Sequence, residues 1–138
     1  MTKTVLVVED NPINWKVFER ILTKRGGLAA KHTEDVETVM ELAQSKQADL
    51  ILMDISLENS YYNGQVIDGI QITQMLKANP ETADLPIILV TAHGSRYDRE
   101  YFINKSGADG YIPKPVIDHK AFLAEIHAKL SVQEKMAS

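Results

Sequence analysis

Three short, uninterrupted apolar runs constrain the fold of this chain more than any other feature. They are Val5–Val8, Leu50–Met53 and Ile87–Val90. A strand with one face in water alternates apolar and polar residues, whereas a short continuous run is typical of a strand that is covered on both faces. Amphipathic helical patterns lie between the runs. We therefore predict an α/β fold, with a parallel sheet and helices on both of its faces.

The first helical pattern has a clear start and end. Asp10 or Asn11 can cap it, Pro12 suits its first turn, and Gly26–Gly27 stops it. Its apolar residues fall on one wide stripe, formed by Ile13, Val17, Phe18, Ile21 and Leu22. We therefore expect a helix that packs through this stripe.

Weaker signals predict the remaining elements. Short strands are expected at residues 28–31 and 110–112, and further helices at 36–43, around 72–76 with an end near Pro80, at 96–105, and after a cap at Asp118. Residues 132–138 are expected to be a loose tail. The predicted organisation is one domain at residues 1–131 followed by a short tail at 132–138.

Composition limits the possible functions. The chain has 138 residues, of which 44% are hydrophobic, which is enough for a single domain of ordinary size. Its 15 basic and 19 acidic residues argue against non-specific binding to nucleic acid. It has no cysteine, and no apolar run is long enough for a signal peptide or a membrane span. We expect an unprocessed, soluble protein of the cytoplasm.

Polar residues follow the predicted strands at comparable positions. Glu9 and Asp10 follow the first run, Asp54 follows the second, Thr91 follows the third, and Lys114 follows the last expected strand. In a parallel α/β sheet, sites form outside the carboxyl ends of the strands. Each residue alone could be a helix cap or a solvated strand end. Their joint placement favours a shared site.

These residues and their order resemble a known family, the receiver domain of two-component response regulators. The resemblance rests on Glu9-Asp10-Asn11, on Asp49 to Asp54, on Thr91-Ala92 and on Lys114-Pro115, and it extends from about Thr4 to Leu130. It implies a flavodoxin-like (βα)5 sandwich of three layers, whose five parallel strands have the order 2-1-3-4-5.

The resemblance also implies a chemistry. Asp54 matches the phosphoacceptor, whose carboxylate attacks a phosphohistidine on a sensor histidine kinase or a histidine phosphotransfer protein. Mg²⁺ is the implied cofactor, and its ligands would be Glu9, Asp10, Asp54 and the backbone carbonyl of Ser56. The implied protein is a signalling switch that catalyses only its own phosphotransfer and dephosphorylation.

Other residues match supporting positions of the family. Lys114 would contact a phosphoryl oxygen, and Thr91 would donate its hydroxyl to another. Tyr111 matches an aromatic switch position that follows the movement of Thr91, and we prefer this role to the alternative, a half-buried tyrosine without it. Pro115 matches a proline whose peptide bond is usually cis. His93 is expected to be an exposed loop histidine, and we assign it no role.

The chain departs from the family after Asp54. The pair Asp68-Gly69 best fits the family's Asp-Gly or Ser-Gly pair, which implies an insertion within Glu58–Ile67. Its Asn, Ser and Gly residues favour an exposed turn over a strand. We prefer a tolerated surface insertion. The alternative is a loop that contacts a cognate kinase through Tyr61 and Tyr62.

The expected partners are proteins. No output domain follows Leu130, so a stand-alone regulator should signal through contacts with a downstream target, and a homodimer is possible. By resemblance, the output surface is the face near Tyr97, Tyr101 and Tyr111, and phosphodonors dock on the first helix. Two alternatives remain open, a receiver-like scaffold that acts unphosphorylated and an Mg-dependent aspartyl-phosphate phosphatase. The phosphatase family requires a second aspartate where this chain has Ser56.

Overall fold

The computed structural model describes residues 2–57, 60–92 and 96–137. Five parallel strands form one sheet with the order β2-β1-β3-β6-β7. These strands are β1 (Thr4–Val8), β2 (Ala29–Thr33), β3 (Leu50–Asp54), β6 (Ile87–Thr91) and β7 (Gly110–Pro113). Because β6 and β7 are the fourth and fifth strands of this sheet along the chain, the predicted order 2-1-3-4-5 is confirmed.

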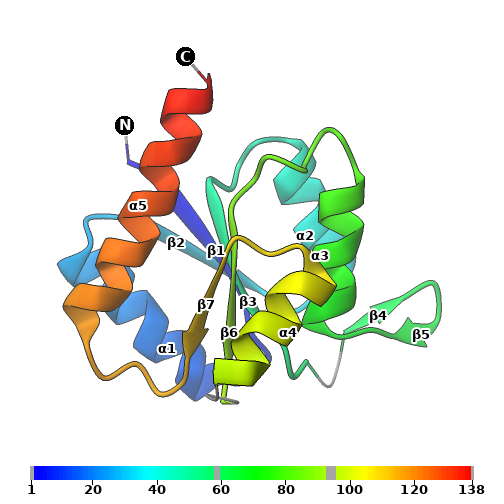
Figure 1. The fold of residues 1–138 in the computed structure, drawn as a ribbon, viewed down its shortest axis with the longest axis horizontal. Coiled ribbons are helices and arrows are strands. Elements are labelled where there is room, and N and C mark those ends of the chain that lie inside the picture. Colours follow the sequence, from blue (N-terminus) through cyan, green and yellow to red (C-terminus); the bar gives the residue numbers. More distant parts are fainter. Residues whose placement is uncertain (1, 58–59, 93–95, 138) are drawn as a thin grey trace.

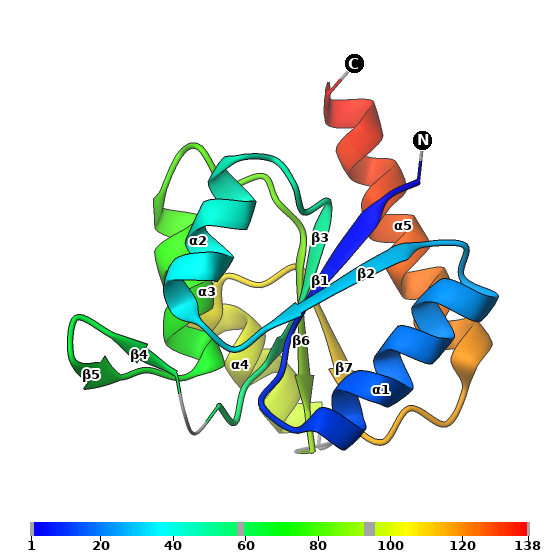
Figure 2. The ribbon, with the colours of Figure 1, turned by 180° about the vertical axis from the view of Figure 1, so that it is seen from behind.

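Helices cover both faces of the sheet, as Figures 1 and 2 show from opposite sides. Helices α1 and α5 lie on one face, and α2, α3 and α4 lie on the other. Their bounds are Pro12–Arg20 for α1, Val36–Gln44 for α2, Gly69–Ala78 for α3, Arg96–Ser106 for α4 and His119–Ala137 for α5. The structure is therefore the predicted flavodoxin-like sandwich of three layers.

The apolar runs are buried because alternate residues enter different cores. Val5 and Val7 of β1 pack in the core beneath α1 and α5, whereas Leu6 and Val8 pack beneath α2 and α3. All five residues of β3 are buried, as are all five of β6. This two-sided burial explains why the central strands carry no alternation of polar residues.

Helix α1 differs in two ways from its prediction. Asn11 caps it by accepting hydrogen bonds from two backbone N–H groups, and the helical segment stops at Gly26 as predicted, but its last part, Ile21–Arg25, is a π-helical turn and not α-helix. The expected stripe is only partly buried. Phe18 and the two apolar residues of the π-helical turn, Ile21 and Leu22, pack in the core. Ile13 and Val17 do not, and they are 74% and 46% exposed.

The inserted segment is a β-hairpin, so the expectation of a turn without strands is wrong. Strands β4 (Tyr61–Tyr62) and β5 (Gln65–Val66) pair in antiparallel register, and Asn63 and Gly64 between them both have positive φ. The hairpin projects from the body of the domain beside α3 (Figure 1). Glu58 lies outside the described residues.

The expected loose tail is also wrong in its secondary structure. Helix α5 begins after Asp118, whose side chain accepts a hydrogen bond from the Ala121 backbone N–H, and it continues to Ala137. None of the helices in the described part of the chain has the length and apolar character needed to cross a membrane.

Candidate functional site

The carboxyl ends of β1 and β3 bring three acidic side chains together. Val8 at the end of β1 pairs with Met53 of β3, so Glu9 and Asp10 leave the sheet beside Asp54. One carboxylate oxygen from each of these residues lies within 4.8 Å of the other two. The prediction that these acids meet at one edge of the sheet agrees with this geometry.

Lys114 places a positive charge between two of these acids. Its ammonium nitrogen lies 3.3 Å from Oε1 of Glu9 and 3.4 Å from Oδ1 of Asp54. Glu9 and Asp54 are both buried, and the Lys114 side chain is only 16% exposed. The lysine therefore balances part of a negative charge that is largely withdrawn from water.

The main chain around Lys114 ties it to Thr91. The Lys114 backbone N–H donates a hydrogen bond of 2.7 Å to the Thr91 carbonyl oxygen. Thr91 is the last residue of β6 and is fully buried. The Lys114–Pro115 peptide bond is cis, as the sequence resemblance implies.

The position of Asp54 is fixed from two sides. Its Oδ1 accepts a hydrogen bond of 3.1 Å from the Ser56 backbone N–H. On the other side the α3 N-terminus approaches, and the Gly69 N–H donates to the Ile55 carbonyl at 3.2 Å. A Cβ added at Gly69 would lie 2.0 Å from the Asp54 carbonyl oxygen. The Asp68-Gly69 pair thus closes the chain against Asp54 despite the longer insertion.

Burial dominates the electrostatics of Glu9. It raises the pKa of Glu9 from 4.5 to about 7, and a hydrogen bond with Asp54 and repulsion from its charge act in the same direction. The Oε2 atom of Glu9 has no hydrogen-bond partner among the residues that the structure describes. The acid at position 9 therefore binds a proton more readily than an exposed glutamate does.

One residue that acts on this acid, Asn14, was not predicted from the sequence. A hydrogen bond from the Asn14 side chain opposes the rise in the Glu9 pKa, as does the charge of Lys114. Asn14 lies in the first turn of α1, four residues after Asp10. A polar residue among the apolar positions at the start of this helix was the available signal.

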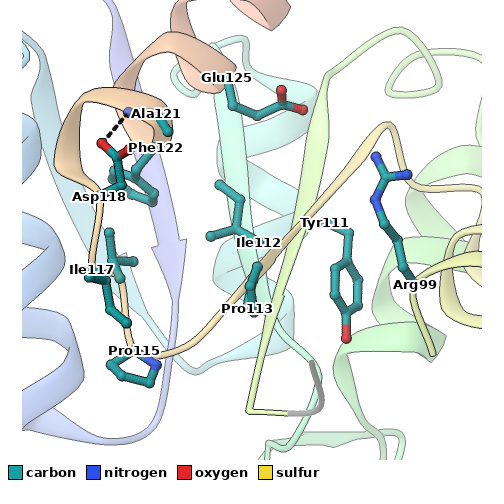
Figure 3. Close-up of a pocket in the computed structure, with 11 residues that line it drawn as sticks. Arg99, Tyr111, Ile112, Pro113, Pro115, Ile117, Asp118, Ala121, Phe122 and Glu125 are labelled. Carbon is teal, nitrogen blue, oxygen red and sulfur yellow. Dashed lines mark hydrogen bonds between the residues drawn. The ribbon is translucent and has the colours of Figure 1, made fainter. Parts of the chain in front are cut away.

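Tyr111 occupies the side of β7 that faces α4. Its ring is buried and stacks on Phe102 of α4, with 6.5 Å between the centroids and 11° between the planes. Figure 3 shows Tyr111 and Ile112 projecting to opposite sides of β7, with Arg99 of α4 beside Tyr111. Across the described residues, the Tyr111 hydroxyl has no hydrogen-bond partner. Burial raises the pKa of Tyr111, and the charge of Asp98 adds to the shift.

The two remaining sequence-predicted residues are His93 and Ser56. His93 falls outside the residues that the structure describes. Ser56 is exposed, and its contact with the site is the backbone hydrogen bond to Asp54.

Comparison with known proteins gives a consistent result. Residues 5–127 match the family model described as response regulator receiver domain. The chain is 37% identical over 116 residues to the polar-differentiation response regulator DivK of Brucella ovis, which covers 84% of this chain and 87% of that protein.

Solved structures agree with the sequence comparison. The CheY-like receiver domain protein of Methanospirillum hungatei JF-1 has a TM-score of 0.78 at 24% identity and covers 99% of both chains, which shows the shared fold. The receiver domain of the sensor histidine kinase PA1611 of Pseudomonas aeruginosa PAO1 has a TM-score of 0.71 at 29% identity, and covers 96% of this chain and 98% of its own. That structure has a magnesium ion coordinated in its active-site cleft.

Proposed function

Because this chain belongs to the receiver domain family of response regulators, we propose that Asp54 accepts a phosphoryl group from a sensor histidine kinase or a histidine phosphotransfer protein. The phosphorylated protein then signals through contacts with a downstream protein. One observation carries the proposal. Asp54 ends a fully buried strand, with the Lys114 ammonium 3.4 Å away and two further acids alongside.

The proposed transfer exchanges one bond for another. A carboxylate oxygen of Asp54 forms a bond to phosphorus while the phosphorus–nitrogen bond of the phosphohistidine breaks, and the imidazole leaves with the electron pair. The aspartate is a nucleophile without an assisting base, so positioning and charge stabilisation are the main tasks of the site. The hydrogen bond from the Ser56 N–H directs one oxygen of Asp54, which leaves the other for attack.

The acidic residues suit a magnesium ion. Glu9, Asp10 and Asp54 supply carboxylate oxygens, and we assign a fourth ligand to the Ser56 backbone carbonyl. The Glu9 carboxylate supports this fit, because it is buried and its Oε2 has no partner in the described part of the protein. When bound, the ion neutralises negative charge that the approaching phosphoryl group would otherwise meet. The related PA1611 receiver domain binds magnesium in its cleft.

Lys114 and Thr91 are proposed to hold the phosphoryl oxygens. The Lys114 ammonium has three donors and already lies within 3.4 Å of the nucleophile, so a small movement away from Glu9 would bring it to a phosphoryl oxygen. The Thr91 hydroxyl would donate to another oxygen. We propose that the Tyr111 side chain changes position when Thr91 binds the phosphoryl group, and so alters the surface near α4. Its buried hydroxyl makes no hydrogen bond within the described structure, so a move would break none there.

The phosphodonor is proposed to dock beside α1. A cavity of about 350 Å³ lies between this helix and the segment after β7, and its lining includes Val17, Lys114 and Pro115. The exposed side chains of Ile13 and Val17 extend this apolar surface on α1. A helical partner that packs there would bring its phosphohistidine to the edge of the sheet where Asp54 lies.

The downstream target is proposed to bind the face formed by α4, β7 and α5. A cavity of about 380 Å³ opens there between Arg99, Tyr111 and Glu125, and Figure 3 shows these side chains around it. The exposed Ile117 adds apolar surface at its rim. The same face is the proposed site of self-association. Since phosphohistidine is made from ATP, the proposal also implies a cytoplasmic location.

Phosphorylation of the intact chain by a small phosphoryl donor tests the proposal. Phosphoramidate can donate to a receiver without a docking surface, so it separates the chemistry of Asp54 from the identity of the kinase. Comparison with an Asp54→Asn variant then assigns the modified residue.

A further inference from the structure

A groove lies on the molecule between α2, α3 and the β4–β5 hairpin. Its volume is about 760 Å³, within the usual range for sites that bind small molecules or peptide side chains. Its lining includes Glu37, Met40 and Glu41 of α2, Met75 of α3 and Tyr62 of the hairpin. None of these residues belongs to the proposed phosphorylation site.

The hairpin is anchored to the body of the domain. The buried Ser60 hydroxyl donates a hydrogen bond of 2.6 Å to the Glu34 carbonyl, just before α2, and the Ile67 N–H donates to the Ser60 carbonyl at 3.0 Å. Tyr62 packs against the core, whereas Tyr61, which pairs with Val66, is 57% exposed. The insertion is therefore held in place, and Tyr62 belongs to the groove.

Charge is distributed unevenly along the chain, and this groove lies in the acidic part. Residues 33–76 contain eight acidic residues and a single basic one, Lys46. The Lys46 ammonium donates to the Glu81 carbonyl oxygen at 2.7 Å. Within the described residues, neither Glu37 nor Glu41 forms an ion pair with a basic side chain. No basic side chain is among the described residues that line the groove, so the lining carries a net negative charge.

We propose that this groove binds a basic segment of a partner protein, with lysine or arginine side chains flanking an apolar one. The cationic groups would pair with Glu37 and Glu41, which lie one helical turn apart on α2 and are both exposed. The apolar side chain would lie on Met40 and Met75, whose flexible thioethers adapt to different shapes. This surface is distinct from both α1 and the face of α4, β7 and α5.

The charge decides the class of partner. Nucleic acid and anionic membrane surfaces are both negative, so the glutamates would repel them. A basic protein segment is attracted, and the attraction should weaken as salt screens the exposed glutamates. A second copy of this chain, whose acids outnumber its bases 19 to 15, is a poorer match for the same groove.

Binding of a defined peptide to the ¹⁵N-labelled chain tests the inference. The probe is a short peptide in which lysines flank leucine, and its control replaces each lysine by glutamate. The expected result is that amide shifts cluster on α2, α3 and the hairpin with the lysine peptide only. Glu37→Lys/Glu41→Lys should weaken binding by about tenfold or more, since it reverses both glutamate charges. Tyr62→Ala should also weaken it, without changing the charge.

The matched control reverses two glutamates on other helices, the half-buried Glu19 of α1 and the exposed Glu100 of α4, as Glu19→Lys/Glu100→Lys, and should change binding by less than about twofold. Equal weakening by both double variants would overturn the proposal, because the net charge of the chain would then explain the binding without the groove. Shifts confined to residues around Asp54, or no effect of Tyr62→Ala, would overturn it as well. Sedimentation of the chain alone gives a further check: a dimer abolished by Glu37→Lys/Glu41→Lys would mean that a second copy occupies the groove.

Discussion

Gly69 lies so close to Asp54 that a Cβ at position 69 would fall 2.0 Å from the Asp54 carbonyl oxygen. Gly69 is the first residue of α3 and follows the cap Asp68, whose side chain forms a capping box with Gln71. The start of α3 therefore holds the proposed nucleophile in place. The lack of a side chain at position 69 is therefore needed for the placement of Asp54.

We predict that Gly69→Ala impairs both stability and phosphotransfer. The methyl group must push the main chain of Asp54 away, which we expect to cost about 1–3 kcal/mol of unfolding free energy and to misplace the carboxylate. Urea denaturation and the initial rate of phosphorylation by phosphoramidate measure the two effects.

Gly27→Ala is the matched control for this prediction. Gly27 has a φ of +65°, but open space surrounds its Cβ position, so alanine should cost about 1 kcal/mol through the backbone alone. Its phosphorylation rate should stay close to that of the wild type. Equal rates for Gly69→Ala and Gly27→Ala would show that the contact does not position Asp54.

The buried Glu9 predicts an unusual dependence of stability on pH in the metal-free protein. Burial raises the pKa of Glu9 to about 7, above its ordinary value of 4.5, so the folded state binds more protons than the unfolded state between these values. The unfolding free energy should therefore fall as pH rises from about 4.5 to 7 and stay at its lowest value above pH 7. The total decrease should be roughly 3 kcal/mol.

Glu9→Gln should remove most of this slope. Urea denaturation in a chelator at several pH values between 5 and 8 measures it. The variant should be more stable than the wild type at pH 8, and Mg²⁺ at that pH should stabilise the wild type more than the variant. Parallel stability curves for the two proteins across this pH range would show that Glu9 is not the titrating group.

The Tyr111 hydroxyl gives a third prediction. It is buried and has no hydrogen-bond partner in the described structure, so Tyr111→Phe should leave the unfolding free energy unchanged or raise it by about 1 kcal/mol. The phosphorylation rate should also be unaffected, because the residue is proposed to act after the transfer. A loss of more than about 1 kcal/mol would reveal a partner that the hydroxyl does have.

A large part of the site could be predicted from sequence because strand ends are local signals. Glu9, Asp10 and Asp54 each close or follow an apolar run, and the parallel topology then requires them to meet at one edge of the sheet. The 3.3 Å contact between Lys114 and Glu9 could not be predicted, since β3 and β6 lie between β7 and β1 in the sheet and the reach of the lysine side chain is not a local signal.

Other features could not be predicted because local sequence patterns give no information about tertiary contacts. The periodicity of α1 is the same whether Ile13 is buried or exposed, so it could not predict that Ile13 is exposed. The residues Asn63-Gly64 between short flanking segments fit a hairpin as well as an open turn. Residues 132–137 carry little apolar pattern, yet helix α5 continues through them from a firmly packed start.

Phosphorylation of Asp54 is the most direct test of the central claim. The intact chain is incubated with phosphoramidate and Mg²⁺, and the wild type is compared with Asp54→Asn on a phosphate-affinity gel and by intact-mass measurement. The wild type should gain the mass of one phosphoryl group, the variant should gain none, and a chelator should prevent the reaction. A wild-type protein that stays unmodified with phosphoramidate and with every histidine-phosphorylated donor tried, or an Asp54→Asn variant that is modified equally, would contradict the account.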